Sequence, residues 1–103
     1  MGTPVIHPAD PVTGSVTVDL GWPVKRKGNG GTLSSVTLRR MNAGDLRAID
    51  ALGPDASDER QALLLIQLCS GMLPLDVDAL DIVDVTALGG VVGGFSVAGR
   101  PTP

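Results

Sequence analysis

The chain has 103 residues, of which 43% are hydrophobic, 18% charged and only 2% aromatic, and its formal net charge is −3. This length supports one domain with a modest core, which must be aliphatic because aromatic residues are so few. The acidic balance disfavours a general nucleic-acid binder, and the single cysteine excludes an internal disulfide. No apolar run approaches the roughly 20 residues that span a bilayer. We therefore expect a small soluble cytoplasmic protein that contacts neither membranes nor nucleic acid.

The two ends of the chain carry turn-forming residues rather than a periodic pattern. Residues 1–14 contain three prolines, and the segment SVAGRPTP at residues 96–103 contains two more. Such segments rarely form regular structure unless a neighbouring element fixes them. We predict an extended arm over residues 1–14, a single α+β domain over residues 15–95 and a flexible tail over residues 96–103.

Residues 15–40 carry two alternating apolar patterns, which predict a β-hairpin. The apolar residues are Val16, Val18, Leu20, Trp22 and Val24 in the first pattern, and Val36 and Leu38 in the second. A period of two residues is typical of strands with one buried face. The KRKGNGG segment between the patterns supplies glycines for a tight turn. Because an isolated hairpin is marginally stable in water, we expect helices to cover its apolar face.

The remainder of the domain is predicted to be helical. The helices are expected over residues 42–52, 57–72, 75–80 and 82–95. The residues expected to cap them are Asn42 with Asp45, Asp55 or Ser57, Asp76 or Asp78, and Asp81 with Asp84. Apolar positions between residues 62 and 72 fill an arc of about 200°, about twice the width of an ordinary surface helix's apolar stripe. This helix is therefore expected to be covered on two sides, with Leu64, Leu68 and Leu88 in the core.

The last predicted helix carries glycines at positions 89, 90, 93 and 94. Each costs about 1 kcal/mol relative to alanine in a helix interior, so packing must hold this helix, and its C-terminal turns should be ragged. The small-xxx-small spacing would let another helix approach closely. We favour a close contact within the chain over a contact with a second chain.

The residue inventory predicts neither catalysis nor a bound metal or cofactor. The sole histidine, His7, lies in the N-terminal arm, where a general base would lack a fixed position. Cys69 lies among leucines, where a thiol is typically a small hydrophobic side chain. The aspartates at positions 76, 78, 81 and 84 lack the glycine and the bidentate glutamate of a calcium loop. The Lys25–Lys27 cluster lacks the spacing of a phosphate-binding loop, so a charged hairpin tip is favoured.

A family resemblance runs from about residue 15 to residue 95. VDLGWPV, a glycine-rich turn and LSSVTLRRMNAGDLRAIDAL resemble the entry segment of the tail assembly chaperones of Mu-like contractile phages. The later segments ERQALLLIQLCSGM and ALDIVDVTALGGVVGGF are similar to that family in order and spacing.

This resemblance implies a non-enzymatic protein of the bacterial host cytoplasm. A chaperone of this kind binds the tape measure protein, keeps it soluble while the tail tube forms around it, and is absent from the mature virion. The resemblance also implies self-association and, through a frameshifted extended form in many phages, contact with the tail tube protein. The residues expected to contact a partner are Leu63, Ile66, Met72, Val91 and Phe95.

Two other functions remain open from the sequence. One is a structural tail component, such as a connector or a tube-associated subunit. The other is a small phage regulator that binds nucleic acid through the Lys25–Lys27 turn and through Arg39 and Arg40.

Overall fold

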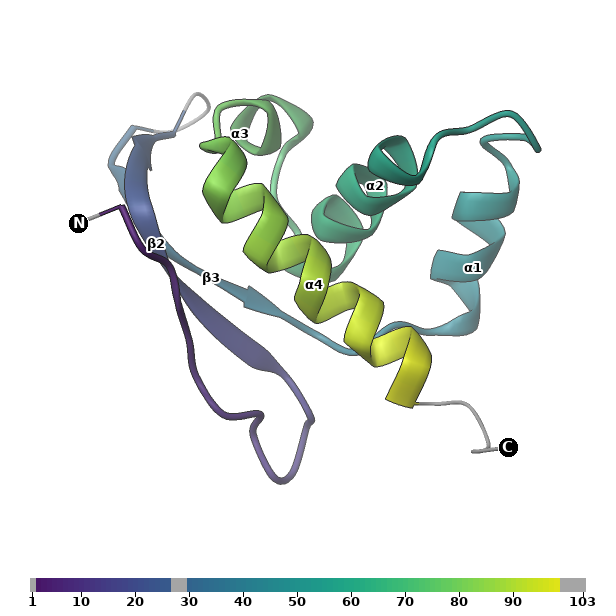
Figure 1. Ribbon diagram of the computed structural model, residues 1–103, viewed down its shortest axis with the longest axis horizontal. Helices are drawn as coiled ribbons and strands as arrows, with labels where there is room; N and C mark the ends of the chain where they lie inside the picture. Colours follow the sequence, from purple (N-terminus) through teal and green to yellow (C-terminus); the bar gives the residue numbers. More distant parts are fainter. Residues whose placement is uncertain (1, 27–29, 99–103) are drawn as a thin grey trace.

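The computed structural model describes residues 2–26 and 30–98, with side chains described as far as Phe95. The elements are β1 (Val5–Ile6), β2 (Val16–Lys25), β3 (Thr32–Leu38), α1 (Ala43–Asp50), α2 (Asp58–Ser70), α3 (Pro74–Asp78) and α4 (Ile82–Ala98). Helix α4 packs on β2 and α2 packs on β3, while α1 packs on α2 away from the sheet (Figure 1). This is the predicted α+β fold. The predicted hairpin tip at residues 27–29, and residues 99–103 of the predicted tail, lie outside the described residues.

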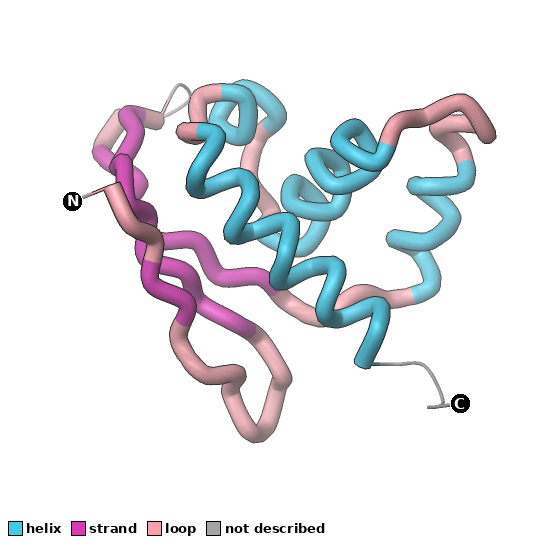
Figure 2. Tube along the Cα trace, viewed as in Figure 1, coloured by secondary structure: helices cyan, strands magenta, loops and turns pink. Residues whose placement is uncertain are grey.

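The sheet is antiparallel with the strand order β1-β2-β3 (Figure 2). The predicted hairpin is confirmed, with Val16 opposite Leu38 and Val18 opposite Val36. The third strand was not predicted, since only two residues of the N-terminal segment pair with β2. Outside those pairs, the backbone N–H of Gly2 donates to the Gly21 carbonyl at 3.0 Å. The N-terminal segment is therefore extended along the edge of β2.

The predicted inward position of Trp22 is wrong, because β2 is irregular between Asp19 and Val24. Over this stretch β2 advances five residues while β3 advances only two, from Ser35 to Leu33. The extra residues break the alternation, so the Trp22 side chain is 51% exposed although the earlier apolar residues of β2 are buried. A bulge of this kind also leaves backbone N–H groups without ladder partners.

Most helix boundaries follow from local capping chemistry. Asn42 and Asp45 form the predicted reciprocal capping box at the start of α1, and Ser57 caps α2. Helix α2 ends at Gly71, whose φ of 73° is accessible to glycine at little cost. The predicted aspartate cap of α3 is wrong: α3 begins with Pro74 at its first turn and has no side-chain cap.

Helix α4 begins at Ile82 as predicted, but the role of Asp84 and the C-terminal end of the helix differ from the prediction. Asp81 caps it by accepting the Val83 N–H at 2.9 Å, but the Asp84 carboxylate bonds to β2 instead. At the other end the helix continues through the glycines to Ala98. The predicted close contact on the glycine face is wrong for Gly90, Gly93 and Gly94 among the described residues, because a Cβ atom placed on any of them would meet none of their atoms within 4 Å beyond the neighbouring helix backbone. A Cβ on Gly89 would only make ordinary contact with Ala62, at 3.9 Å.

The core lies between the sheet and the two central helices. Its buried apolar residues are Val16, Val18, Leu20, Leu33, Val36, Leu38, Ile66, Cys69, Val77, Leu80, Leu88, Val92 and Phe95. Leu88 is fully buried, as predicted, whereas Leu64 and Leu68 are only half-buried. Both lie on α2, which rests on the sheet through Ile66 and Cys69 instead.

Candidate partner-binding surface

The five residues predicted to contact a partner do not form one surface. Ile66 is 0% exposed and Phe95 is 8% exposed, and both belong to the core cluster. Val91 and Met72 are half-buried against the same cluster, and Leu63 is 37% exposed. The fold itself therefore buries Ile66 and Phe95, and the contact of these five residues with a partner stays a prediction.

The reason lies in how α2 and α4 meet the sheet. An apolar arc of about 200° on α2 does not reveal which of its edges faces outward. The structure turns Ile66 and Cys69 inward and leaves Leu63 at the outer margin. On α4 the Phe95 ring is covered partly by Arg40, whose guanidinium carbon lies 5.8 Å from the ring centroid.

An apolar hollow opens where α2, α3 and α4 meet, and we call it the three-helix groove. Its volume is about 570 Å³, and it is lined by Glu59, Leu63, Val77, Asp78, Leu80, Ile82, Val85 and Thr86. Val77 and Leu80 are buried, while Ile82 is 72% exposed and Leu63 is 37% exposed. Of the five predicted partner residues, this groove includes only Leu63.

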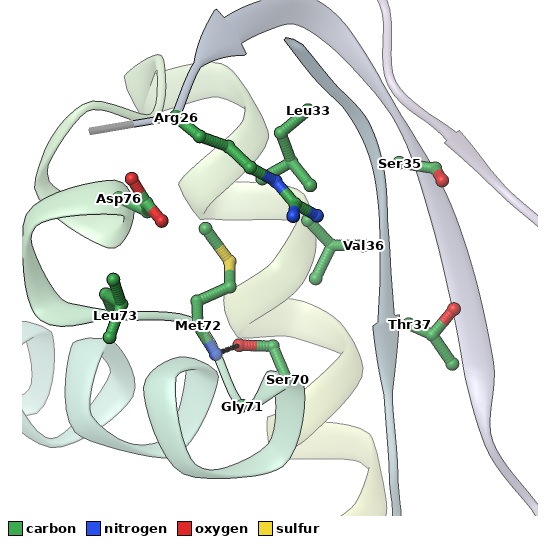
Figure 3. Close-up of a pocket in the computed structure, with 10 residues that line it drawn as sticks. All are labelled: Arg26, Leu33, Ser35, Val36, Thr37, Ser70, Gly71, Met72, Leu73 and Asp76. Atoms are coloured by element: carbon green, nitrogen blue, oxygen red, sulfur yellow. Dashed lines mark hydrogen bonds between the residues drawn. The ribbon is translucent and has the colours of Figure 1, made fainter. Parts of the chain in front are cut away.

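A second hollow lies beside the edge of β3 (Figure 3). It has a volume of about 440 Å³ and is lined by Arg26, Leu33, Ser35, Val36, Thr37, Ser70, Gly71, Met72, Leu73 and Asp76. In Figure 3 the Met72 side chain extends between the Asp76 carboxylate and β3, in the direction of Arg26. Met72 therefore belongs to a different and more polar surface than Leu63.

Sequence reasoning missed the exposed apolar side chains around α3. Leu73, Leu75, Ile82 and Val83 are all exposed, and they lie within eleven consecutive residues, 73–83. The signal that could have found them is the short length of α3, since a five-residue helix has little surface with which to bury its own apolar residues.

The buried charges of the molecule have structural partners. The Arg39 guanidinium donates two hydrogen bonds to the Asp45 carboxylate, at 2.8 and 3.0 Å, and this lowers the pKa of Asp45 despite its burial. Asp45 also accepts the backbone N–H of Asn42 at 2.9 Å. Burial raises the pKa of the Cys69 thiol above its ordinary value, which disfavours the nucleophilic thiolate.

The described residues contain no group of three or more side chains suited to hold a metal ion. His7 is held near the sheet, with its Nε2 atom 2.8 Å from Asp19 Oδ2 on the exposed surface. None of the helices in ranges 2–26 and 30–98 is long and apolar enough to cross a membrane.

Comparison with known proteins agrees with this geometry. No curated protein and no solved structure gives a significant match to the chain. Residues 17–97, however, match the family described as phage tail assembly chaperone proteins, E, or 41 or 14. The match covers β2 except its first residue, all of β3 and all but the last residue of the helical region. The chain therefore belongs to the phage tail assembly chaperone family, a membership that implies a non-catalytic role in assembly.

Proposed function

We propose that this chain binds the tape measure protein in the bacterial host cytoplasm and keeps it soluble until the tail tube has formed around it. The chain then leaves and is absent from the mature virion. In this proposal the tail tube protein is a second partner, and the chaperone acts as a homo-oligomer. Each of these statements goes beyond membership of the family.

The observation that carries the proposal is the exposed apolar surface of the helical layer. Side chains such as Leu75 and Ile82 are 64% and 72% exposed, although the fold already has a complete core between its sheet and its helices. A long helical protein with an apolar face would aggregate on its own, and an apolar helix-binding surface can mask such a face. An assembly chaperone needs a surface of this kind, whereas an enzyme does not.

The test is co-expression of the candidate tape measure protein with and without this chain. We expect the soluble fraction of the tape measure protein to rise, and the two proteins to co-elute from a sizing column. Purified virions should lack the chain in a peptide mass analysis. If solubility does not change and the chain is found in virions, it is a structural tail component instead.

Nucleic-acid binding is checked in the same samples. The regulator alternative requires DNA affinity that falls steeply with salt, because phosphate contacts release counterions. We expect no such affinity, since the chain carries a net charge of −3.

A further inference from the structure

We propose that the three-helix groove receives an amphipathic helix of the tape measure protein whose apolar face is bordered by lysine or arginine. This inference rests on the proposed function and adds to it the docking site and the chemistry of the bound segment. Three observations support it: the shape of the groove, the charges that line it, and the composition of the segments of this chain that could occupy it.

The shape of the groove suits a helix better than an extended peptide. Its floor contains the buried side chains of Val77 and Leu80, and the exposed Ile82 and the margin residue Leu63 stand beside them. Three helices surround it, so it presents no strand edge to which a peptide could add. An amphipathic helix buries side chains spaced i, i+3 or i+4 and i+7 in an apolar groove of this kind.

The charges of the groove select the flanks of that helix. The charged side chains that line it are Glu59 from α2 and Asp78 from α3, and no lysine or arginine lies among its lining residues. A helix flanked by acidic residues would therefore meet like charges, which costs affinity and slows association. A helix flanked by lysine or arginine would meet opposite charges at the rim of an apolar floor.

The rest of this chain does not supply such a helix. The residues outside the described ranges are Met1, 27–29 and 99–103, and only Met1 among them has a large apolar side chain. A second copy fits no better, because α3 and α4 contain no lysine or arginine, and α1 and α2 contain one arginine each. None of these residues provides such a helix, and we therefore assign the occupant to a different protein.

The experiment uses the full chain and overlapping peptides of about 25 residues covering the tape measure protein, a length that allows several helical turns. We expect the bound peptides to combine an apolar i, i+3, i+4, i+7 pattern with flanking lysine or arginine. The double variant Glu59→Lys with Asp78→Lys should weaken their binding by about tenfold or more, and so should Ile82→Asp. Peptides with their basic flanks changed to glutamate should bind the double variant better than the wild type.

Matched controls keep this test specific. Asp50→Lys with Asp55→Lys makes the same change of charge at exposed positions that do not line the groove, and Leu46→Asp adds a charge at a side chain that is 56% exposed on α1. Both controls should bind the peptides as the wild type does. Circular dichroism and thermal unfolding of each variant show whether it is folded.

The outcomes separate this inference from the proposed function. If folded groove variants bind the full-length tape measure protein as tightly as the wild type, the groove is not the docking site, although the chaperone function stands. If these variants change only the size of the chain's own oligomer, the occupant is a second copy and the inference is wrong. If the wild type itself binds no tape measure protein, the proposed function and this inference fail together.

Discussion

Asp84, fully buried at the start of α4, accepts a hydrogen bond of 2.8 Å from the backbone N–H of Gly21 in β2. Its second carboxylate oxygen accepts the neighbouring N–H of Trp22 at 3.0 Å. These two donors lie in the bulge of β2, between the last ladder pairs at Asp19 and Val24. One side chain thus accepts hydrogen bonds from two neighbouring backbone N–H groups of the bulge and joins the last helix to the sheet.

We expect Asp84→Asn to destabilise the fold by about 1–3 kcal/mol, because the amide group can accept only one of the two hydrogen bonds and presents an N–H to the other donor. Urea unfolding followed by the fluorescence of Trp22, the only tryptophan, measures this change. Asp50→Asn, at an exposed position of α1, is the matched control and should be neutral. Equal stability of the two variants would show that the carboxylate does not hold α4 to the sheet.

Gly21 should tolerate no side chain. A Cβ atom there would lie 2.6 Å from the carbonyl carbon of Gly2 and 2.8 Å from the backbone nitrogen of Thr3. Backbone atoms cannot turn away, so Gly21→Ala should displace the N-terminal segment and cost about 1–3 kcal/mol. Limited proteolysis should then cut the segment before β2 faster than in the wild type, and an unchanged cleavage rate would contradict this account.

Much of the fold could be predicted because it depends on local chemistry. The alternation at Val16 and Val18 and the capping box at Asn42 and Asp45 are signals within a few residues of one another, and both are confirmed. Asp84 was misassigned because an aspartate in the first turn of a helix has the same sequence signature whether it caps the helix or bonds to a distant strand. The bulge that exposes Trp22 likewise involves a contact with a distant residue, because the Trp22 N–H donates to Asp84, 62 positions later in the chain.

The contribution of the Arg39–Asp45 ion pair to the stability of the fold should depend on pH. Because the guanidinium lowers the folded-state pKa of Asp45, the stabilisation is complete above the ordinary value of 3.8 and is lost as the pH falls below it. We expect Asp45→Asn to cost about 1–3 kcal/mol at pH 7 and much less near about pH 2. Chemical unfolding of both proteins at several pH values measures the difference, and a constant difference would mean that the pair does not titrate as described.

The exposed glycines of α4 should be replaceable. At Gly90 and Gly93 an alanine Cβ would meet no atom of the described part of the chain within 4 Å beyond the neighbouring helix backbone. Each substitution should therefore stabilise the fold by about 0.5–1 kcal/mol through helix propensity alone. Thermal unfolding should show a higher midpoint for each variant and a nearly additive rise for both. A fall in stability would indicate an internal contact on this face.

The candidate surface was harder to predict than the fold. Ile66 lies at one edge of the apolar arc of α2 and Leu63 lies about 60° beyond that edge, and the structure buries Ile66 while it leaves Leu63 37% exposed. The three-helix groove combines residues from α2, α3 and α4, so no single stretch of sequence carries it. Its acidic rim joins Glu59 of α2 with Asp78 of α3, which lie nineteen positions apart in the chain, so no local pattern predicts the pair.

The burial of Cys69 gives the molecule an internal reporter. It is the only cysteine, its side chain lies between α2 and the sheet, and its carbonyl accepts the Arg39 N–H just after β3 at 3.0 Å. A disulfide reagent can therefore reach the thiol only when α2 separates from β3. The rate of labelling then measures how often this separation occurs. A partner that docks on the outer face of the helices should slow the labelling without contacting the cysteine. Because Cys69 is part of the native sequence, the experiment needs no substitution.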